Sequence, residues 1–223
     1  MKRTTLPAIL LAFSALSFLS SCDDDKEEVV EPVPNQSFTQ EFDNVASATS
    51  AGWTFSNKSA PVGTTNWANG PGAAAFSGTG FITSDYLATT GAGIISNWAI
   101  SPIVTMQNGD KIEFYAISAN DNSDPANVYP DRLQVLIAKS PEINIGSGDD
   151  AGGFQAILDI NAQYANTNPI AFPDVWTKFV ATIDGLNGPV QGRFAFRYFV
   201  EDGGPAGVNS AAIGIDKVSY VGK

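Results

Sequence analysis

The chain has 223 residues, 43% of them hydrophobic, and its 23 acidic residues outnumber 12 basic ones for a formal net charge of −11. This length suits one large domain with flanking segments, and the acidic balance argues against a nucleic-acid partner because such a surface repels phosphate backbones. Histidine is absent and Cys22 is the single cysteine, which excludes a Ser-His-Asp triad and an intrachain disulfide.

Residues 1–22 are predicted to be a lipoprotein signal peptide. Lys2 and Arg3 precede an apolar stretch of 14 residues, which is shorter than the roughly 20 that a membrane-spanning helix needs. The stretch ends in Leu19-Ser20-Ser21-Cys22, which resembles the lipobox of bacterial lipoproteins, where the cysteine thiol accepts the lipid. An ordinary secretory signal with a chance cysteine is the alternative. We expect lipidation at Cys22.

Residues 23–37 are predicted to be an acidic, proline-containing tether. The run Asp23-Asp24-Asp25-Lys26-Glu27-Glu28 resembles the tag that directs some Gram-negative lipoproteins to the outer face of the outer membrane. A solvated spacer is one alternative, and in other bacteria an Asp after the cysteine resembles an inner-membrane retention signal. Pro32 and Pro34 favour an extended segment. We expect a chain held at the outer membrane through its lipid alone and facing the cell surface.

Residues 38–223 are predicted to form an all-β domain, a jelly-roll β-sandwich of two antiparallel sheets. Short β-branched and aromatic runs bounded by Gly, Pro, Asn or Asp are typical of such folds. About ten strands are expected, at 38–42, 53–57, 81–84, 94–100, 111–118, 132–138, 154–160, 176–184, 193–200 and 211–221. Only 155–164 has a pattern that a short helix could also produce. Long polar loops with aromatic residues, typical of binding loops, fall at 58–80, 119–131, 139–152, 161–175 and 201–210.

The pair Asn108-Gly109 lies between the apolar runs 94–100 and 111–118. Asn-Gly between two strand-like runs is a strong signal for a two-residue turn, because both residues tolerate positive φ. We therefore expect these runs to pair as a central hairpin.

A series of short motifs, taken in order, resembles the choice-of-anchor J domain over residues 38–221. The motifs are Glu41-Phe42-Asp43, Gly52-Trp53, Asn97-Trp98-Ala99-Ile100-Ser101-Pro102, Asp131-Arg132-Leu133-Gln134-Val135, Trp176, Phe194-Ala195-Phe196-Arg197-Tyr198 and Gly214-Ile215-Asp216-Lys217-Val218. That family is related to MAM and cleaved-adhesin domains, which are jelly-roll sandwiches. The resemblance implies a bacterial surface module for adhesion or for contact with glycans, usually without catalysis.

Acidic residues on the first and last predicted strands are candidates for a structural calcium site. Glu41 and Asp43 alternate to one face of the first strand, and Asp216 lies on the last. Related jelly rolls place these strands side by side around an ion, so the resemblance implies calcium, although relatives often have Ile-Asp-Asp where this chain has Ile215-Asp216-Lys217. Calcium needs six to eight oxygen ligands, so backbone carbonyls or water would complete the shell. Solvated edge carboxylates are the alternative.

Three further acids, Asp121, Asp124 and Asp131, fall in one predicted loop, where turn chemistry is the simpler explanation. The chain has no Glu-x-Asp-x-x-Glu run, and Glu201 and Asp202 are adjacent, so on a strand they would point apart. We therefore expect no enzymatic activity, with a glycan hydrolase as the less favoured alternative.

The aromatic residues are the remaining candidates for binding. Trp53, Trp98 and Trp176 fall in or beside predicted strands and are expected in the core.

Trp67 lies in the polar loop Thr64-Thr65-Asn66-Trp67-Ala68-Asn69-Gly70, where an exposed indole beside Asn66 and Asn69 would suit a sugar ring. Tyr129 and Tyr164 are weaker candidates in other loops. A loop aromatic that plugs the end of the sandwich is the alternative for Trp67. The expected partner is a glycan or a surface protein, and the competing hypothesis is a structural or assembly module without a ligand of its own.

Overall fold

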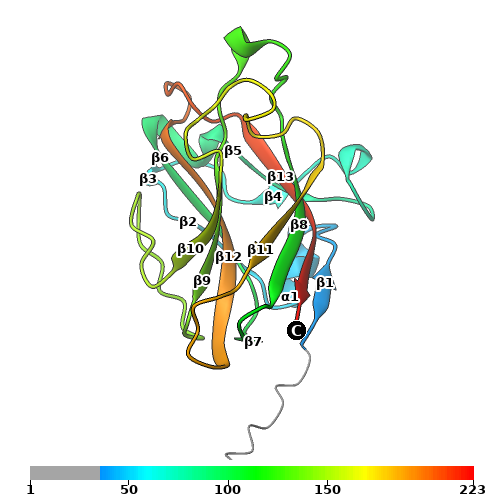
Figure 1. Ribbon diagram of the computed structural model, residues 1–223. Coiled ribbons are helices and arrows are strands. Elements are labelled where there is room, and N and C mark those ends of the chain that lie inside the picture. The colour runs from blue at the N-terminus through cyan, green and yellow to red at the C-terminus, as the bar shows by residue number, and fades with distance from the viewer. Residues whose placement is uncertain (1–35) are drawn as a thin grey trace, which may run out of the picture. The chain divides into compact units, whose positions relative to one another are not determined.

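The structure is a computed structural model that describes residues 36–223 (Figure 1). The predicted signal peptide, the lipidation site Cys22 and nearly all of the acidic tether lie outside the described residues. Within the part described, no helix is long and apolar enough to span a membrane.

Two antiparallel sheets form the domain, as the sequence predicts. The six-stranded sheet has the order β11-β8-β13-β5-β4, with β1 beside β13, and the seven-stranded sheet has the order β10-β9-β12-β6-β2, with β3 beside β6 and β7 beside β12. The strands are β1 (Phe38–Gln40), β2 (Thr54–Asn57), β3 (Ala60–Val62), β4 (Ala68–Asn69), β5 (Ile82–Asp85), β6 (Thr89–Ile100), β7 (Val104–Met106), β8 (Lys111–Ser118), β9 (Leu133–Ala138), β10 (Gln155–Ile160), β11 (Thr177–Thr182), β12 (Val190–Gly203) and β13 (Ala212–Val221). The helical elements are α1 (Val45–Ser50), η1 (Gly72–Ala74), η2 (Tyr86–Ala88) and η3 (Pro125–Asn127).

Each of the ten predicted strands is present within a few residues of its expected bounds. The strands that the sequence did not predict are β3, β4 and β7, which have two or three residues each. The segment that could have been a short helix is the strand β10. Strands β3, β4 and β7 have too few residues to show the period-two alternation on which the prediction depends.

The predicted hairpin around Asn108-Gly109 is wrong. Strand β6 belongs to the seven-stranded sheet and β8 to the six-stranded sheet, so the two do not pair. Between them β7 leaves the line of β6 and pairs with β12, and the Asn-Gly turn then crosses from one sheet to the other. Gly109 has the expected positive φ of 97°, but Asn108 does not have a positive φ, so the turn differs from the expected one and the pairing partner is also different. The Asn108 side chain instead bonds both backbone groups of Leu186, at 2.8 and 2.9 Å.

The core lies between the sheets, and period-two alternation places it there. On β8 the side chains of Ile112, Phe114 and Ala116 are fully buried, while their neighbours face outward. Phe194 and Phe196 on β12 face them across the sandwich, and the rings of Phe114 and Phe196 meet edge to face at 4.8 Å. Burial of such apolar and aromatic side chains is the dominant favourable term in folding.

Two of the three tryptophans predicted for the core are buried as expected, Trp53 at 2% exposure and Trp98 at 0%. Trp98 lies on the outer face of the seven-stranded sheet, under a loop that ends in Phe154, whose ring is 5.4 Å away. Trp176 is only half-buried, because it precedes β11 and packs against Phe81 on the outer face of the six-stranded sheet. Its placement in the core is therefore a wrong prediction.

Arg197 is a cation buried on the outer face of the seven-stranded sheet, with 2% exposure. Its guanidinium lies 4.9 Å from the Trp98 ring centroid and donates to Ser96 Oγ at 2.9 Å and to the carbonyls of Gly148 and Asp150. Burial lowers its pKa to about 10. These bonds attach the loop at 139–154 to the sheet, since a buried charge is tolerated only where it is fully bonded.

Candidate functional site

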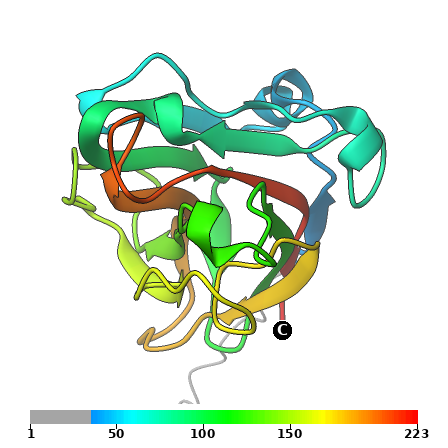
Figure 2. The same ribbon diagram turned by 90° about the horizontal axis from the view of Figure 1, so that it is seen from above.

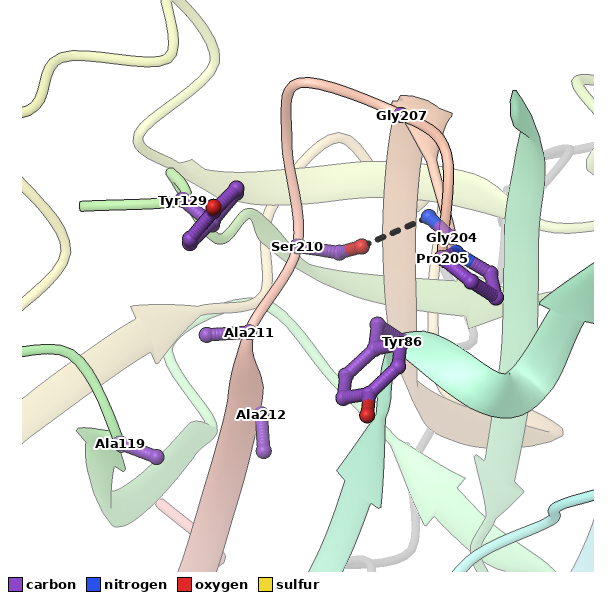
Figure 3. A pocket seen from close by; sticks show the side chains of 9 residues that line it. All are labelled: Tyr86, Ala119, Tyr129, Gly204, Pro205, Gly207, Ser210, Ala211 and Ala212. Atoms are coloured by element: carbon purple, nitrogen blue, oxygen red, sulfur yellow. Dashed lines mark hydrogen bonds between the residues drawn. The ribbon is translucent and has the colours of Figure 1, made fainter. Parts of the chain in front are cut away.

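A pocket of about 540 Å³ opens at one end of the sandwich, where the chain segments around η2, 119–131 and 203–212 meet. Figure 2 looks down on this end, with η3 in the centre. The pocket is lined by Tyr86, Ala119, Tyr129, Gly204, Pro205, Gly207, Ser210, Ala211 and Ala212 (Figure 3). Its volume falls within the roughly 300–1,000 Å³ usual for small-molecule sites.

Two exposed tyrosines flank this pocket, which is called the tyrosine pocket below. Tyr86 is 40% exposed and Tyr129 is 51% exposed, and in Figure 3 their rings stand on either side of the segment from Ser210 to Ala212. Neither hydroxyl has a hydrogen-bond partner among residues 36–223. Each ring therefore offers an apolar face and a free donor and acceptor to a ligand.

The wall from Gly204 to Ser210 is a tightly bonded loop. The carbonyl of Asp202 accepts from the backbone N–H groups of Val208 and Asn209 at 3.0 and 3.1 Å, and Gly204 N donates to Ser210 Oγ at 2.9 Å. Ser210 is buried and has a φ of 75°, a region that non-glycine residues seldom occupy. Residues held in such conformations cluster at binding and active sites. The wall is therefore a rigid surface, as a binding site requires.

Behind the tyrosine pocket, the Asp131 carboxylate is hydrogen-bonded to both the Ser210–Ala212 segment and the loop that carries Tyr129. Its carboxylate is fully buried and accepts from Ser118 Oγ at 2.6 Å, Tyr198 OH at 2.5 Å and Ala211 N at 2.9 Å. It also accepts from Asn120 Nδ2 at 3.2 Å.

Asn120 carries this network to the pocket rim. Its side chain bonds the backbone O and N of Tyr129 at 2.9 and 3.0 Å. Burial raises the pKa of Asp131, although the hydrogen bonds from Ser118, Tyr198 and Ala211 oppose that rise.

The loop acids divide into two kinds. Asp121 bonds Ser123 N at 3.0 Å and Asp124 bonds Asn127 Nδ2 at 2.7 Å, so the expected turn chemistry is confirmed for both. For Asp131 that expectation is wrong, because it is a buried bridging residue.

The prediction that Trp67 is an exposed ligand platform is wrong. Its side chain is 4% exposed and packs in the main hydrophobic core. Asn66 Oδ1 accepts from Trp67 N at 2.8 Å, and Asn69 Oδ1 accepts from Val45 N at the start of α1 at 2.7 Å. These amides fix the backbone of the loop, and none of the three residues lines the tyrosine pocket.

Tyr129 is the one predicted ligand-binding residue that lines the pocket. Tyr164, the other weak candidate, lies elsewhere, where its hydroxyl donates to Glu201 Oε2 at 3.2 Å and its ring lies under Arg132. Tyr86 was not predicted. The signal that could have found it is an aromatic residue two positions after the predicted strand at 81–84, at the end of the sheet.

The predicted calcium ligands have mostly structural partners. Asp216 is buried, and its Oδ2 accepts from Phe76 N and Ser77 N at 2.8 and 2.9 Å. Asp43 Oδ1 accepts from Thr79 N and Oγ1. Burial raises the pKa of Asp216, and the nearby Glu41 carboxylate adds to that rise.

Glu41 contributes the one unsatisfied oxygen of this region, because its Oε2 is buried without a hydrogen-bond partner. Among residues 36–223 there is no group of three or more His, Cys, Asp or Glu side chains that could hold a metal ion. Any ion here would therefore depend on Glu41 and Asp216, with backbone carbonyls and water as the further ligands.

A second aromatic cluster covers the outer face of the six-stranded sheet. Phe76, 40% exposed, stacks on Tyr115 with ring centroids 3.6 Å apart. Trp176 lies beside it and donates from Nε1 to the carbonyl of Ala74 at 2.8 Å. Because these rings pack on one another and the indole N–H is bonded, the cluster serves to attach the loop containing η1 to the sheet.

The two antiparallel sheets and their order define a jelly-roll-like β-sandwich. The fold is similar to the K1 cleaved adhesin domain of Lys-gingipain (Kgp) from Porphyromonas gingivalis W83, with a TM-score of 0.53 and 20% identity over 84% of this chain and 98% of that chain. The K3 cleaved adhesin domain of the same protein matches with a TM-score of 0.50 and 14% identity over 83% and 98%.

A carbohydrate-binding module, TmCBM61 solved in complex with β-1,4-galactotriose, is also similar, with a TM-score of 0.43 and 9% identity over 82% of this chain and 97% of that one. No protein-family model and no curated protein matches the sequence. The likenesses to the two cleaved adhesin domains show the fold.

Replacing Trp67 with Ala should lower the free energy of unfolding by about 3–5 kcal/mol, the usual cost of removing a buried tryptophan. Trp67→Phe is the matched control. It keeps a ring and removes an indole N–H that has no partner among the described residues, so it should cost less. Denaturant unfolding of the three proteins measures this, and an unchanged midpoint for Trp67→Ala would contradict the core placement.

Asp131 should make stability depend on pH. Because its pKa in the folded chain is raised above the ordinary 3.8, its contribution to stability is fully present below about pH 3.8 and is lost as the pH rises through the folded-state pKa. Asp131→Asn removes this titration. The unfolding free energy of the wild type, relative to that of Asp131→Asn, should therefore increase as the pH falls from about 7 to about 4. Parallel denaturant melts across that range measure it, and a constant difference would refute it.

Proposed function

We propose that this chain is a non-catalytic binding module that holds a glycan in the tyrosine pocket, between Tyr86 and Tyr129. The observation that carries the proposal is a pocket flanked by two exposed rings whose hydroxyls have no partner among residues 36–223. Sugar rings present CH groups that stack on aromatic faces and hydroxyls that bond phenols and backbone groups. Every side chain that lines this pocket is uncharged, so it contains no acid–base pair of the kind that glycoside hydrolysis uses.

The fold supports a surface module. Adhesin domains of similar fold exist, and the sequence motifs resemble the choice-of-anchor J domain, so we propose that residues 38–221 form such a domain. A protein ligand, or a purely structural role, would appear as the absence of any retained glycan in the experiment that follows.

Truncating either tyrosine should weaken binding without unfolding the domain. On a glycan array, Tyr86→Ala and Tyr129→Ala should each lose about 2 kcal/mol, roughly 25-fold in affinity, for whichever glycan the wild type retains. Their melting temperatures should stay unchanged because both side chains are exposed.

The matched control for these variants is Phe76→Ala, which removes an aromatic side chain of the same exposure as Tyr86 from the outer face of the six-stranded sheet. Loss of binding in this control, with binding retained in the tyrosine variants, would move the site to that face.

We also propose a structural calcium ion held by Glu41 and Asp216, with Asp43 supporting the adjoining loop. The unpartnered, buried Oε2 of Glu41 supports it, since a buried carboxylate oxygen without a donor is costly unless a cation neutralises it. When bound, the ion would neutralise two close carboxylates.

Chelator should then lower the melting temperature and added calcium restore it, because an ion at about 100 times its dissociation constant contributes about 2.7 kcal/mol. Glu41→Gln should abolish the response, while the exposed Glu142→Gln should retain it. Identical melts with and without chelator would exclude the ion.

Finally, we propose that Cys22 is lipidated and that the acidic run after it places the domain at the cell surface of the outer membrane. The motif supports this, together with its position at the end of the apolar stretch. Cys22→Ala should abolish lipid labelling and release the protein from the membrane fraction, because several acyl chains are needed for stable anchoring. Replacing Asp23, Asp24 and Asp25 with Ala should keep the label but reduce protease accessibility on whole cells. Labelling that persists in Cys22→Ala would refute the anchor.

A further inference from the structure

We infer that the tyrosine pocket selects uncharged sugars and rejects acidic ones, such as sialic acids, uronic acids and sulfated sugars. This inference rests on the proposed function and adds the chemical class of the ligand. It depends on three features of the pocket: the residues that line it, the charges around it, and whether the cations near it are already paired with carboxylates.

The lining consists of aromatic rings, small side chains and backbone. Tyr86, Tyr129 and Ser210 supply its hydroxyl groups, and the rest is Gly, Ala and Pro. Ser210 Oγ already accepts from Gly204 N, so the two phenols are the main side-chain partners left for a ligand. Such a surface can bond neutral hydroxyls and cover CH groups, but it offers no positive charge to an acid group.

The charges closest along the chain to the lining residues are negative. Asp85 directly precedes Tyr86, Asp202 is exposed two residues before Gly204, and the buried Asp131 bonds Ala211 N from behind the wall. An acidic sugar entering the pocket would approach these carboxylates, and like charges in a partly enclosed site repel.

The cation nearest in sequence to Tyr129, Arg132, is already paired with carboxylates. Arg132 follows Asp131, but its guanidinium bonds Asp159 at 2.9 and 2.7 Å and Glu201 at 3.0 Å. Its side chain is 13% exposed. Lys217 is five residues beyond Ala212 on β13, roughly 16 Å at the usual rise of a strand, which exceeds the screening length of about 8 Å in physiological salt.

The uncharged lining, with carboxylates beside and behind it, therefore suits a neutral sugar face, stacked between or against the two rings.

The test is a glycan array that contains matched neutral and acidic forms, such as N-acetyllactosamine and its 3′-sialylated counterpart. Neutral forms should be retained at least tenfold better than acidic ones, and the affinity for them should not change between low and high salt. Preferred retention of acidic forms would overturn the inference and leave the glycan-binding function standing. Retention of no glycan would overturn both.

A charge-reversal variant sharpens the test. Ala119 is exposed and lines the pocket, so Ala119→Lys should fold and place an ammonium group at the rim, whereas Ala119→Gln adds a side chain without the charge. The ratio of acidic to neutral binding should rise at least tenfold in Ala119→Lys and stay unchanged in Ala119→Gln. Equal ratios in the two variants, with normal melts, would show that charge does not control selection here.

Discussion

The buried carboxylate of Asp131 is the constraint on which the candidate site depends. A carboxylate that has lost its hydration is tolerated only where hydrogen bonds replace the water. The donors come from the end of β8, from the loop that carries Tyr129, from β12 and from Ala211, the residue before β13. Because these elements must all reach one pair of oxygens, the position of each is fixed relative to the others. The pocket between them therefore has a defined shape before any ligand arrives.

On both faces of the sandwich, too, a buried charged side chain bonds the backbone of a loop. Arg197 attaches the loop at 139–154 to the seven-stranded sheet through the carbonyls of Gly148 and Asp150. Asp216 attaches the loop at 71–81 to the six-stranded sheet through the N–H groups of Phe76 and Ser77. A single buried charge thus orders each loop by bonding its backbone. This arrangement leaves most loop side chains free to vary without loss of order.

The strands were predictable because alternation is a local property, so each of the ten runs with a clear pattern of apolar residues became a strand. Pairing is not local: Asn108 and Gly109 make their turn, yet β8 joins the other sheet because β7 pairs with β12, which lies far along the chain. Burial of Trp67 could not be predicted for the same reason. Its loop is polar, and the core residues that cover it come from other segments.

Tyr129 could be placed in a binding loop from its neighbours in sequence. Tyr86 and Asp131 both contact the backbone of Ala211, which is 125 residues from Tyr86 and 80 residues from Asp131. No local sequence pattern shows such contacts.

The location of the site follows from what the loops cover. In many β-sandwiches an outer sheet face can serve for binding, but here Trp98 and Phe154 lie under one loop and Tyr115 lies under Phe76 of another. Because loops cover these aromatic residues on both faces, the end of the sandwich is where two exposed rings stand beside a cavity. The charged groups that order the three loop regions are bonded and mostly buried, so they are not available to a ligand. What remains at the surface of the pocket is uncharged, and this is the physical reason that the fold favours recognition through stacking and hydroxyl groups over recognition through charge.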